Sequence, residues 1–108
     1  MENLYQITAE APDYVVALFG KIDAANYEQI QSDILNMIET NENIETFTFD
    51  VNEVSYVSSA GIRMFSAINK ACKMNQISYK LTGLREDILK MFQLTGYSSV
   101  FKIEPKPM

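Results

Sequence analysis

Apolar residues recur along the chain in two patterns, one typical of strands and one typical of helices. Runs of β-forming or alternating residues at 4–9, 14–19, 44–51, 77–81 and 99–103 predict five strands. Apolar residues three or four positions apart predict three helices. These run from near 24 to 40, from the serine pair at 58–59 to about 74, and over 84–94. The predicted order is β-β-α-β-α-β-α-β.

Alternation of strands and helices after an opening hairpin is typical of the α/β class. It predicts a mixed, mostly parallel sheet with helices packed on it. The second strand is apolar throughout and is expected to be buried on both faces. Neither a linker nor a repeat interrupts the pattern. We therefore expect one domain over residues 1–108, with its core at about 3–104 and a frayed tail at 105–108.

Residues that favour turns and caps set the expected boundaries of these elements. Asp23 is a good N-cap for a helix starting near Ala24. Gly20 ends the second strand and Gly83 the fourth, and Gly96 is placed as the left-handed residue that follows the third helix. Residues 52–57 are expected to form a short connection. The methionine and aromatic side chains are expected to lie in the core.

Composition narrows the chemistry open to the chain. It has no histidine, which removes the commonest general base and metal ligand. Its single cysteine, Cys72, occupies an apolar helical position and is interpreted as a buried structural thiol. We therefore expect a protein that is not an enzyme and needs no metal or cofactor.

Charge and hydropathy further limit the expected partners and location. The formal net charge of −5 argues against nucleic acid and against an anionic membrane surface. No apolar run approaches the roughly 18 residues of a membrane span. The first residues lack the basic and apolar regions of a secretory signal. A cytoplasmic location is expected.

The segment at 50–63 carries most of the functional information. A serine at its predicted helix start can cap the helix by accepting a hydrogen bond from a backbone N–H. Gly61 costs about 1 kcal/mol of helix propensity relative to alanine, so it needs another reason, such as close approach of a neighbour, a partner or a phosphate. A helix N-terminus also favours negative charge. From these residues alone, Ser59 is either a simple N-cap or a carrier of phosphate.

The run Val-Ser-Ser-Ala-Gly-Ile-Arg at 57–63 resembles the signature of the STAS domain of bacterial anti-sigma-factor antagonists. Three further stretches agree with this resemblance. The residues at 49–57 resemble the strand that approaches the motif, and Gly-Lys-Ile-Asp at 20–23 resembles the family's turn after the second strand. Residues 88–97 resemble its third helix and the glycine turn that follows. The resemblance spans nearly the whole chain in order, and the family's β-β-α-β-α-β-α-β arrangement matches the predicted one.

The resemblance assigns roles to several residues. It implies that Ser59 is the phosphoacceptor, with Ser58 as the less favoured alternative. Ser58 stands where the family often has aspartate. Asp23 and Asp50 match positions that lie near the phosphorylated serine. The remaining motif neighbours and partner contacts implied are Gly20, Lys21, Gly61 and Arg63.

The implied function is that of an anti-sigma-factor antagonist. The unphosphorylated form would bind an anti-sigma factor that is also a serine kinase, and would thereby release the sigma factor. Phosphorylation of Ser59 would end binding, and a serine phosphatase would restore it. The protein is expected to be a monomer or a weak dimer.

Two other functions stay open. The chain could be a STAS binding module without phosphorylation, for example a subunit of a lipid-transport ABC system or a stressosome-like scaffold. Genes for a kinase and a sigma factor nearby would favour the switch, whereas permease genes would favour the module. An enzyme using Asp23, Asp50 and Ser59 has little support, because no histidine is available to activate the serine and Lys21 is the nearest lysine.

Overall fold

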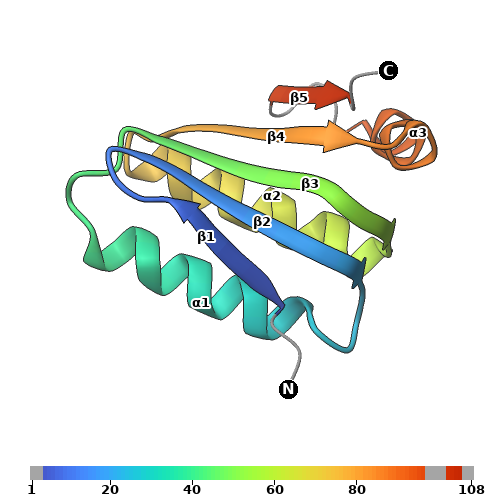
Figure 1. The fold of residues 1–108 in the computed structure, drawn as a ribbon, viewed down its shortest axis with the longest axis horizontal. Helices are drawn as coiled ribbons and strands as arrows, with labels where there is room; N and C mark the ends of the chain where they lie inside the picture. The colour runs from blue at the N-terminus through green and yellow to red at the C-terminus, as the bar shows by residue number, and fades with distance from the viewer. Residues whose placement is uncertain (1–3, 97–101, 106–108) are drawn as a thin grey trace.

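The computed structural model describes residues 4–96 and 102–105 and contains the predicted order of elements. This part of the chain contains five strands and three helices, and Figure 1 shows how they are arranged. The strands are β1 (Tyr5–Ala9), β2 (Asp13–Ile22), β3 (Thr46–Val57), β4 (Ser78–Leu84) and β5 (Lys102–Pro105). The helices are α1 (Tyr27–Thr40), α2 (Ser59–Met74) and α3 (Glu86–Thr95).

The strands form one sheet in the order β1-β2-β3-β4-β5. β1 pairs antiparallel with β2, and the three other pairs are parallel. The sheet is therefore mixed and mostly parallel, as the alternation of strands and helices predicts. Because β2, β3 and β4 are parallel, their carboxyl ends share one end of the sheet, and α2 begins there.

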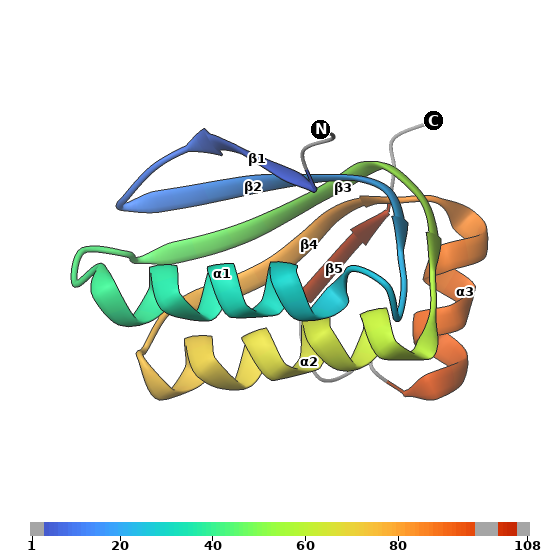
Figure 2. The same cartoon turned by 90° about the horizontal axis from the view of Figure 1, so that it is seen from below.

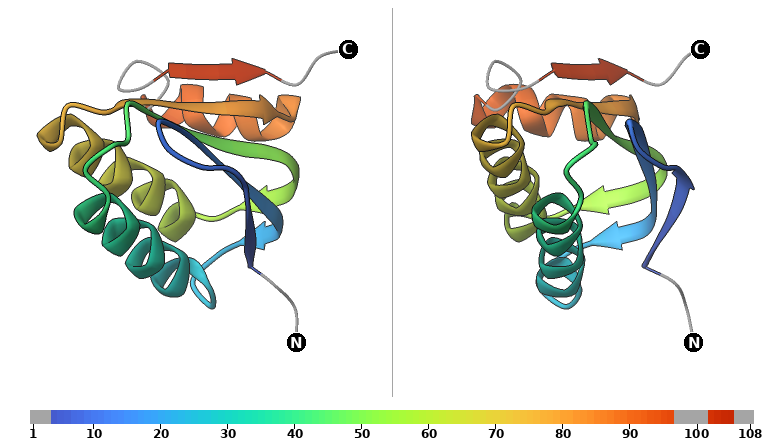
Figure 3. Two further views of the ribbon diagram at one scale, coloured as in Figure 1. Left: turned by 60° about the vertical axis from the view of Figure 1, so that its left-hand side comes forward. Right: turned by 90° about the vertical axis from the view of Figure 1, so that its left-hand side faces the viewer.

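Helices α1 and α2 lie side by side on one face of the sheet (Figure 2). The core between them and the sheet contains a group of aromatic rings. Phe49 contacts Phe65 of α2 edge-on with ring centroids 5.3 Å apart, and Phe65 contacts Phe92 of α3 at 5.9 Å. Figure 3 shows α3 on the β4 side of the molecule, away from α1. These contacts fix α2, and therefore the residues at its start, relative to the sheet.

The opposite face of the sheet is not covered by a helix from the described residues (Figure 2). The expectation that β2 is buried on both faces is correct only for its middle. Val16, Ala17 and Leu18 are buried, whereas Phe19 is exposed. The face without helices is consequently available to solvent near the carboxyl end of β2.

The second half of β3 differs from the expectation. Residues 52–57 were expected to form a connection, but β3 continues through Val57, and both Val54 and Val57 are buried. The extension exists because β2 also runs on, pairing Gly20 with Val54 and Ile22 with Val57 across two register shifts. The expectation that Gly20 ends the second strand is therefore wrong.

The other boundaries move by a few residues. The first helix begins at Tyr27 instead of near Ala24. β4 continues through Gly83, which has φ +80° and whose missing Cβ would lie 3.1 Å from the backbone of Asn52. Gly96 follows α3 with φ +81°, which confirms its predicted left-handed conformation. The last strand is found at 102–105, and residues 99–101 and 106–108 of the predicted strand and tail lie outside the described residues.

None of the helices in residues 4–96 is long and apolar enough to cross a membrane.

Candidate functional site

The serine pair divides two roles at the start of α2. Ser58 is the N-cap residue, with extended backbone angles, and its hydroxyl oxygen accepts a hydrogen bond from the backbone N–H of Gly61 at 3.3 Å. Ser59 is the first residue of the helix and is exposed. Its hydroxyl has no hydrogen-bond partner among residues 4–96 and 102–105. The alternative that Ser59 is simply the N-cap is therefore not what the structure shows.

Gly61 is required by close packing at the end of β2. A Cβ atom at this position would lie 2.8 Å from the backbone oxygen of Ile22 and 2.8 Å from Cγ1 of Val57. The same Ile22 carbonyl accepts a hydrogen bond from the backbone N–H of Ser58 at 2.9 Å. Of the reasons expected for this glycine, the structure shows the close approach of a neighbour. That approach holds the start of α2 tightly against the carboxyl end of β2.

Asp23 lies next to the start of α2, because it directly follows Ile22. Its carboxylate accepts a hydrogen bond from the backbone N–H of Ala25 at 2.9 Å, which is the bond expected of a capping side chain. Asn26 completes the turn: its side chain accepts from the Asp23 N–H and donates to the Lys21 carbonyl. The residues at 23–26 thus form a closed turn, and α1 begins only after this turn.

Asp50 lies farther away than the resemblance implies. The register pairs Ala17 with Asp50 and Ile22 with Val57. The advance of five residues along β2 spans about 16 Å at about 3.3 Å per residue. The Asp50 carboxylate accepts a hydrogen bond from the backbone N–H of Asn52 at 3.0 Å. The structure therefore brings Asp23 to the start of α2 and leaves Asp50 in the middle of the strand.

The charge around Ser59 is favourable for an added anion. The first turn of α2 contains no acidic residue. Arg63 lies four residues after Ser59, and residues with this spacing share one face of a helix. Lys21 lies at the neighbouring end of β2, and within residues 4–96 and 102–105 neither cation is in an ion pair. The helix N-terminus adds its own partial positive charge.

Two aromatic side chains at the same end of the sheet were expected in the core and are exposed instead. Phe19 on β2 is 37% exposed and Tyr56 on β3 is 48% exposed. Tyr56 pairs with Lys21, and Phe19 lies two residues before Lys21 on the same strand. Phe19 and Lys21 also line a hollow of about 680 Å³ beside the turn at Asp23. The exposure of Tyr56 depends on the extension of β3, which the residue pattern did not predict.

Cys72 is buried, as expected for a structural thiol. Its side chain has no exposed surface, and burial raises the pKa of the thiol to about 12. Because the thiolate is the reactive form, this cysteine is a poor nucleophile at neutral pH. The described residues also contain no cluster of three or more carboxylate, cysteine or histidine side chains that could hold a metal ion.

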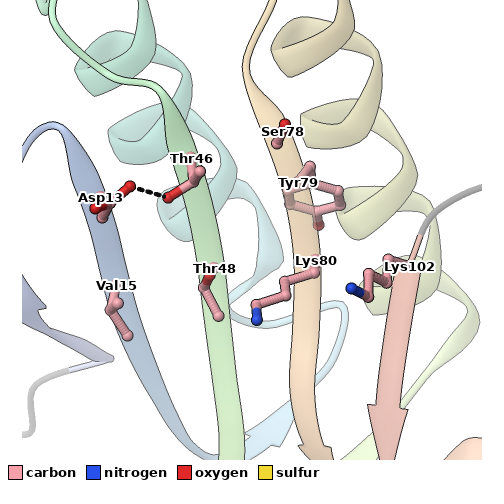
Figure 4. A pocket seen from close by; sticks show the side chains of 8 residues that line it. All are labelled: Asp13, Val15, Thr46, Thr48, Ser78, Tyr79, Lys80 and Lys102. Carbon is pink, nitrogen blue, oxygen red and sulfur yellow. Dashed lines mark hydrogen bonds between the residues drawn. The ribbon is translucent and has the colours of Figure 1, made fainter.

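A separate hollow of about 500 Å³ lies on the sheet face without helices (Figure 4). It is lined by the first residues of four strands, and there Asp13 accepts a hydrogen bond from Thr46 at 2.7 Å. Its two lysines, Lys80 and Lys102, both lie within 4 Å of the Glu104 carboxylate. Because it lies at the amino ends of the strands, it is at the opposite end of the sheet from Ser59.

The fold and the exposed serine at the start of α2 together define a small α/β domain of the kind expected from the motif at 57–63. The family described as the STAS domain matches residues 5–107. The chain therefore belongs to the STAS domain family.

Individual relatives are similar to this chain in sequence, and solved structures are similar to it in fold. The chain is 29% identical to the anti-sigma-B factor antagonist of Listeria monocytogenes over 85 residues, covering 79% of this chain and 73% of that protein. It is 26% identical to the anti-sigma-B factor antagonist of Bacillus subtilis over 94 residues, covering 87% and 84%. The anti-sigma factor antagonist SpoIIAA in its unphosphorylated form has a similar structure, with a TM-score of 0.70 at 21% identity over 83% of this chain and 82% of that one. An anti-sigma factor antagonist from Mycobacterium paratuberculosis gives a TM-score of 0.79 at 16% identity, covering 94% and 84%.

Proposed function

We propose that this protein is an anti-sigma-factor antagonist controlled by phosphorylation of Ser59. The unphosphorylated form binds an anti-sigma factor that is also a serine kinase, and the sigma factor is released. The names of the relatives in Listeria monocytogenes and Bacillus subtilis support the general role. The similarity to these relatives is also the basis for proposing a kinase partner, a serine phosphatase that removes the phosphate, and a cytoplasmic location.

The observation that carries the proposal is the exposure of Ser59 while Ser58 caps the helix. A phosphoacceptor must present its hydroxyl to a kinase, and a hydroxyl used as the N-cap would have to give up its bond first. Here the cap bond is made by Ser58, so modification of Ser59 leaves it intact. The same geometry favours Ser59 over Ser58 as the acceptor.

The reaction on Ser59 is a phosphoryl transfer in which this chain is the substrate. The Ser59 Oγ forms a bond to the γ-phosphorus of ATP, the bond from that phosphorus to the bridging oxygen breaks, and ADP leaves. The hydroxyl proton passes to a base on the kinase. The phosphatase reverses the modification by adding water and releasing inorganic phosphate. Neither step needs a catalytic group from this chain, which agrees with the buried thiol and the absence of histidine.

Phosphorylation acts through charge at the contact surface. A phosphoserine carries about −1.5 to −2 charges at pH 7 and stays stable at a helix N-terminus. Pressed into a packed interface, the same charge is poorly solvated and is repelled by neighbouring carboxylates such as Asp23. A loss of about 3–4 kcal/mol lowers affinity a few hundredfold. Asp50 lies too far along β3 to contribute to this repulsion.

The test is to incubate the protein with ATP and the anti-sigma factor kinase encoded beside its gene, and to locate the phosphate by mass spectrometry. We expect phosphate on Ser59 and none on the Ser59→Ala variant. Ser58→Ala is the matched control and should still be phosphorylated. Phosphate confined to another residue, or none at all, would overturn the proposal.

A further inference from the structure

The hollow on the sheet face without helices gathers polar side chains from four strands (Figure 4), and we call it the four-strand hollow. Its volume of about 500 Å³ lies within the range of small-molecule sites, about 300–1,000 Å³. Because paired residues point to the same face of a sheet, the register sorts its side chains into two rows. One row contains Asp13, Thr46 and Ser78, and the other contains Val15, Thr48, Lys80 and Lys102. Charged groups and hydroxyl groups therefore line one concave surface.

Two lysines give one end of the four-strand hollow an excess of positive charge. The Lys80 Nζ lies 3.6 Å from Oε1 of Glu104, and the Lys102 Nζ lies 3.8 Å from Oε2 of the same carboxylate. Two ammonium groups thus share one carboxylate, which leaves one positive charge without a counter-charge among the described residues. The three side chains are between 38% and 68% exposed, and ion pairs this exposed contribute little free energy. Both lysines can therefore turn toward an added anion.

The other end of the hollow offers a carboxylate and hydroxyl groups. The Asp13 Oδ1 accepts a hydrogen bond from the Thr46 hydroxyl at 2.7 Å, and within residues 4–96 and 102–105 this carboxylate has no cationic partner. In the same ranges the hydroxyl groups of Thr48 and Ser78 form no hydrogen bond. Asp13 lies two strands and two residues away from Lys80, which is about 12 Å between Cα atoms. A ligand that spans the hollow therefore meets cations at one end and hydrogen-bond acceptors at the other.

The lining disfavours apolar ligands and nucleobases. Among the described residues that line the hollow, Val15 is the only aliphatic one and Tyr79 the only aromatic one. The Tyr79 ring, however, packs against Phe47 and Phe49 in the core. Its hydroxyl donates a hydrogen bond to the Phe65 carbonyl at 3.0 Å. The hollow thus has no ring face on which a base could stack, and its chemistry suits a polar ligand.

We propose that the four-strand hollow binds a small anion that carries several hydroxyl groups, such as a polyol phosphate or a sugar acid. Lys80 and Lys102 hold the anionic group through charge-assisted hydrogen bonds. Asp13 and Thr48 bond to the hydroxyl groups. The hollow lies at the amino ends of the strands, about 30 Å from the start of α2, because β2 spans ten residues between the two ends of the sheet. This inference therefore does not depend on the proposed function, and modification of Ser59 should leave the affinity unchanged.

The test is an NMR titration that follows the backbone amide shifts of the whole chain at low salt. The probes are inositol monophosphate, gluconate, uncharged inositol and inorganic phosphate. We expect the two hydroxylated anions to shift the amides of residues 46–48 and 78–80, and their affinity to fall as salt screens the lysines. Inositol should not bind, and inorganic phosphate should bind more weakly than its inositol ester. The tighter of the two hydroxylated anions decides between a phosphate and a carboxylate ligand.

Substitutions test each end of the hollow. Lys80→Gln should weaken binding of inositol monophosphate about three- to fivefold, whereas Lys90→Gln, which removes a similarly exposed lysine paired with Glu86 on α3, should have no effect. Glu104→Gln should strengthen binding about two- to threefold, because the lysines then have no competing carboxylate. Asp13→Ala should weaken binding of inositol monophosphate and leave that of inorganic phosphate unchanged, since the Asp13 carboxylate bonds to a hydroxyl group of the ligand.

Several outcomes would overturn the inference. Neither hydroxylated anion binds the hollow if the amides of residues 46–48 and 78–80 do not shift. Equal affinities for inositol and its phosphate, or an unchanged affinity in folded Lys80→Gln, would remove the role of the lysines. Equal affinities for inorganic phosphate and inositol monophosphate would overturn the recognition of hydroxyl groups. Thermal unfolding of each variant separates lost contacts from a lost fold, and the gain expected for Glu104→Gln cannot come from a damaged fold. Phosphorylation of Ser59 is tested separately and can succeed or fail without affecting these results.

Discussion

The hydroxyl oxygen of Ser58 accepts a hydrogen bond from the backbone N–H of Gly61, at a distance of 3.3 Å. This bond satisfies one of the free N–H groups at the start of α2 and fixes which of two adjacent serines is the cap. The bond also connects Ser58, which follows β3, to Gly61, which packs against the end of β2. The exposed position of Ser59 is a consequence of this arrangement.

The cap bond gives a first prediction about stability. We expect Ser58→Ala to lower the free energy of unfolding by about 1 kcal/mol, because an N-cap side chain is lost. Ser58→Asp should be close to wild type, since aspartate caps a helix as well as serine does. Urea denaturation measures both. Ser55→Ala, an exposed change on β3, is the control and should stay within about 0.5 kcal/mol. A wild-type midpoint for Ser58→Ala would contradict the role of the cap.

The packing of Gly61 gives a second prediction. Alanine would gain about 1 kcal/mol of helix propensity, but its Cβ would lie 2.8 Å from both the Ile22 oxygen and Val57 Cγ1. We expect Gly61→Ala to lose about 1–3 kcal/mol overall, because overpacking outweighs propensity. Thermal unfolding should show a lower midpoint. Ser66→Ala, in the same helix without this crowding, should not lower it, and a raised midpoint for Gly61→Ala would contradict the packing argument.

Gly61 also shows what could and could not be predicted from the sequence pattern. Its cost in a helix indicates a close contact, but the pattern does not identify the contacting group. That group is the Ile22 carbonyl, which is thirty-nine positions earlier in the chain and meets Gly61 only through the pairing of β2 with β3. The order of elements depends on local periodicity and was predicted correctly. The contacts of Gly61 depend on the register between distant strands and were not predicted.

The dependence on strand register also explains why parts of the candidate site were predicted in the wrong place. The segment containing Val54 and Val57 was interpreted as a connection, because register shifts in a strand interrupt the alternation of apolar and polar residues. Their true place in β3 moves Asp50 away from Ser59 and exposes Tyr56 at the carboxyl end of the sheet. Asp23 could be predicted, because it follows a strand end and its capping bond is local.

The Tyr5 hydroxyl donates a hydrogen bond to the Asp33 carboxylate at 3.0 Å and links β1 to α1. Burial raises the pKa of Tyr5, and the bond and charge of Asp33 add to the shift. We expect Tyr5→Phe to lower the free energy of unfolding by about 1 kcal/mol, measured with urea. Tyr27→Phe is the matched control and should have little effect, because within residues 4–96 and 102–105 the Tyr27 hydroxyl bonds only to its exposed neighbour Glu28. Equal effects of the two substitutions would contradict this role for Tyr5.

Burial of Cys72 predicts a dependence of stability on alkaline pH. Its pKa is about 12 in the folded protein against a reference value of 9.0. Between these values the unfolded chain loses the thiol proton while the folded protein keeps it. The free energy of unfolding therefore falls as pH rises above about 9, by up to about 1.4 kcal/mol per pH unit from this group.

Two measurements check this behaviour of Cys72. The Cys72→Ala variant should lose stability less steeply than wild type above pH 9, because the contribution of the thiol is absent. In native protein at neutral pH the thiol should react with a disulfide reagent far more slowly than in denaturant. Rapid reaction of the native protein would show that Cys72 is accessible and would remove the basis for the pH prediction.

The charge preference at the start of α2 predicts the effect of modification on the fold itself. Ser59 is the first helical residue and no acidic residue occupies the first turn, so an anion there meets free N–H groups and the positive end of the helix dipole. We expect Ser59→Asp to raise the free energy of unfolding by about 0.3–1 kcal/mol at low salt, and Ser59→Lys to lower it by a similar amount. Urea denaturation at low and high salt measures the difference, which should shrink as salt screens the charges. If Ser59→Asp is less stable than wild type, loss of partner binding on modification would reflect damage to the domain. If Ser59→Asp is more stable, as we expect, loss of partner binding would come from changes at the binding surface alone.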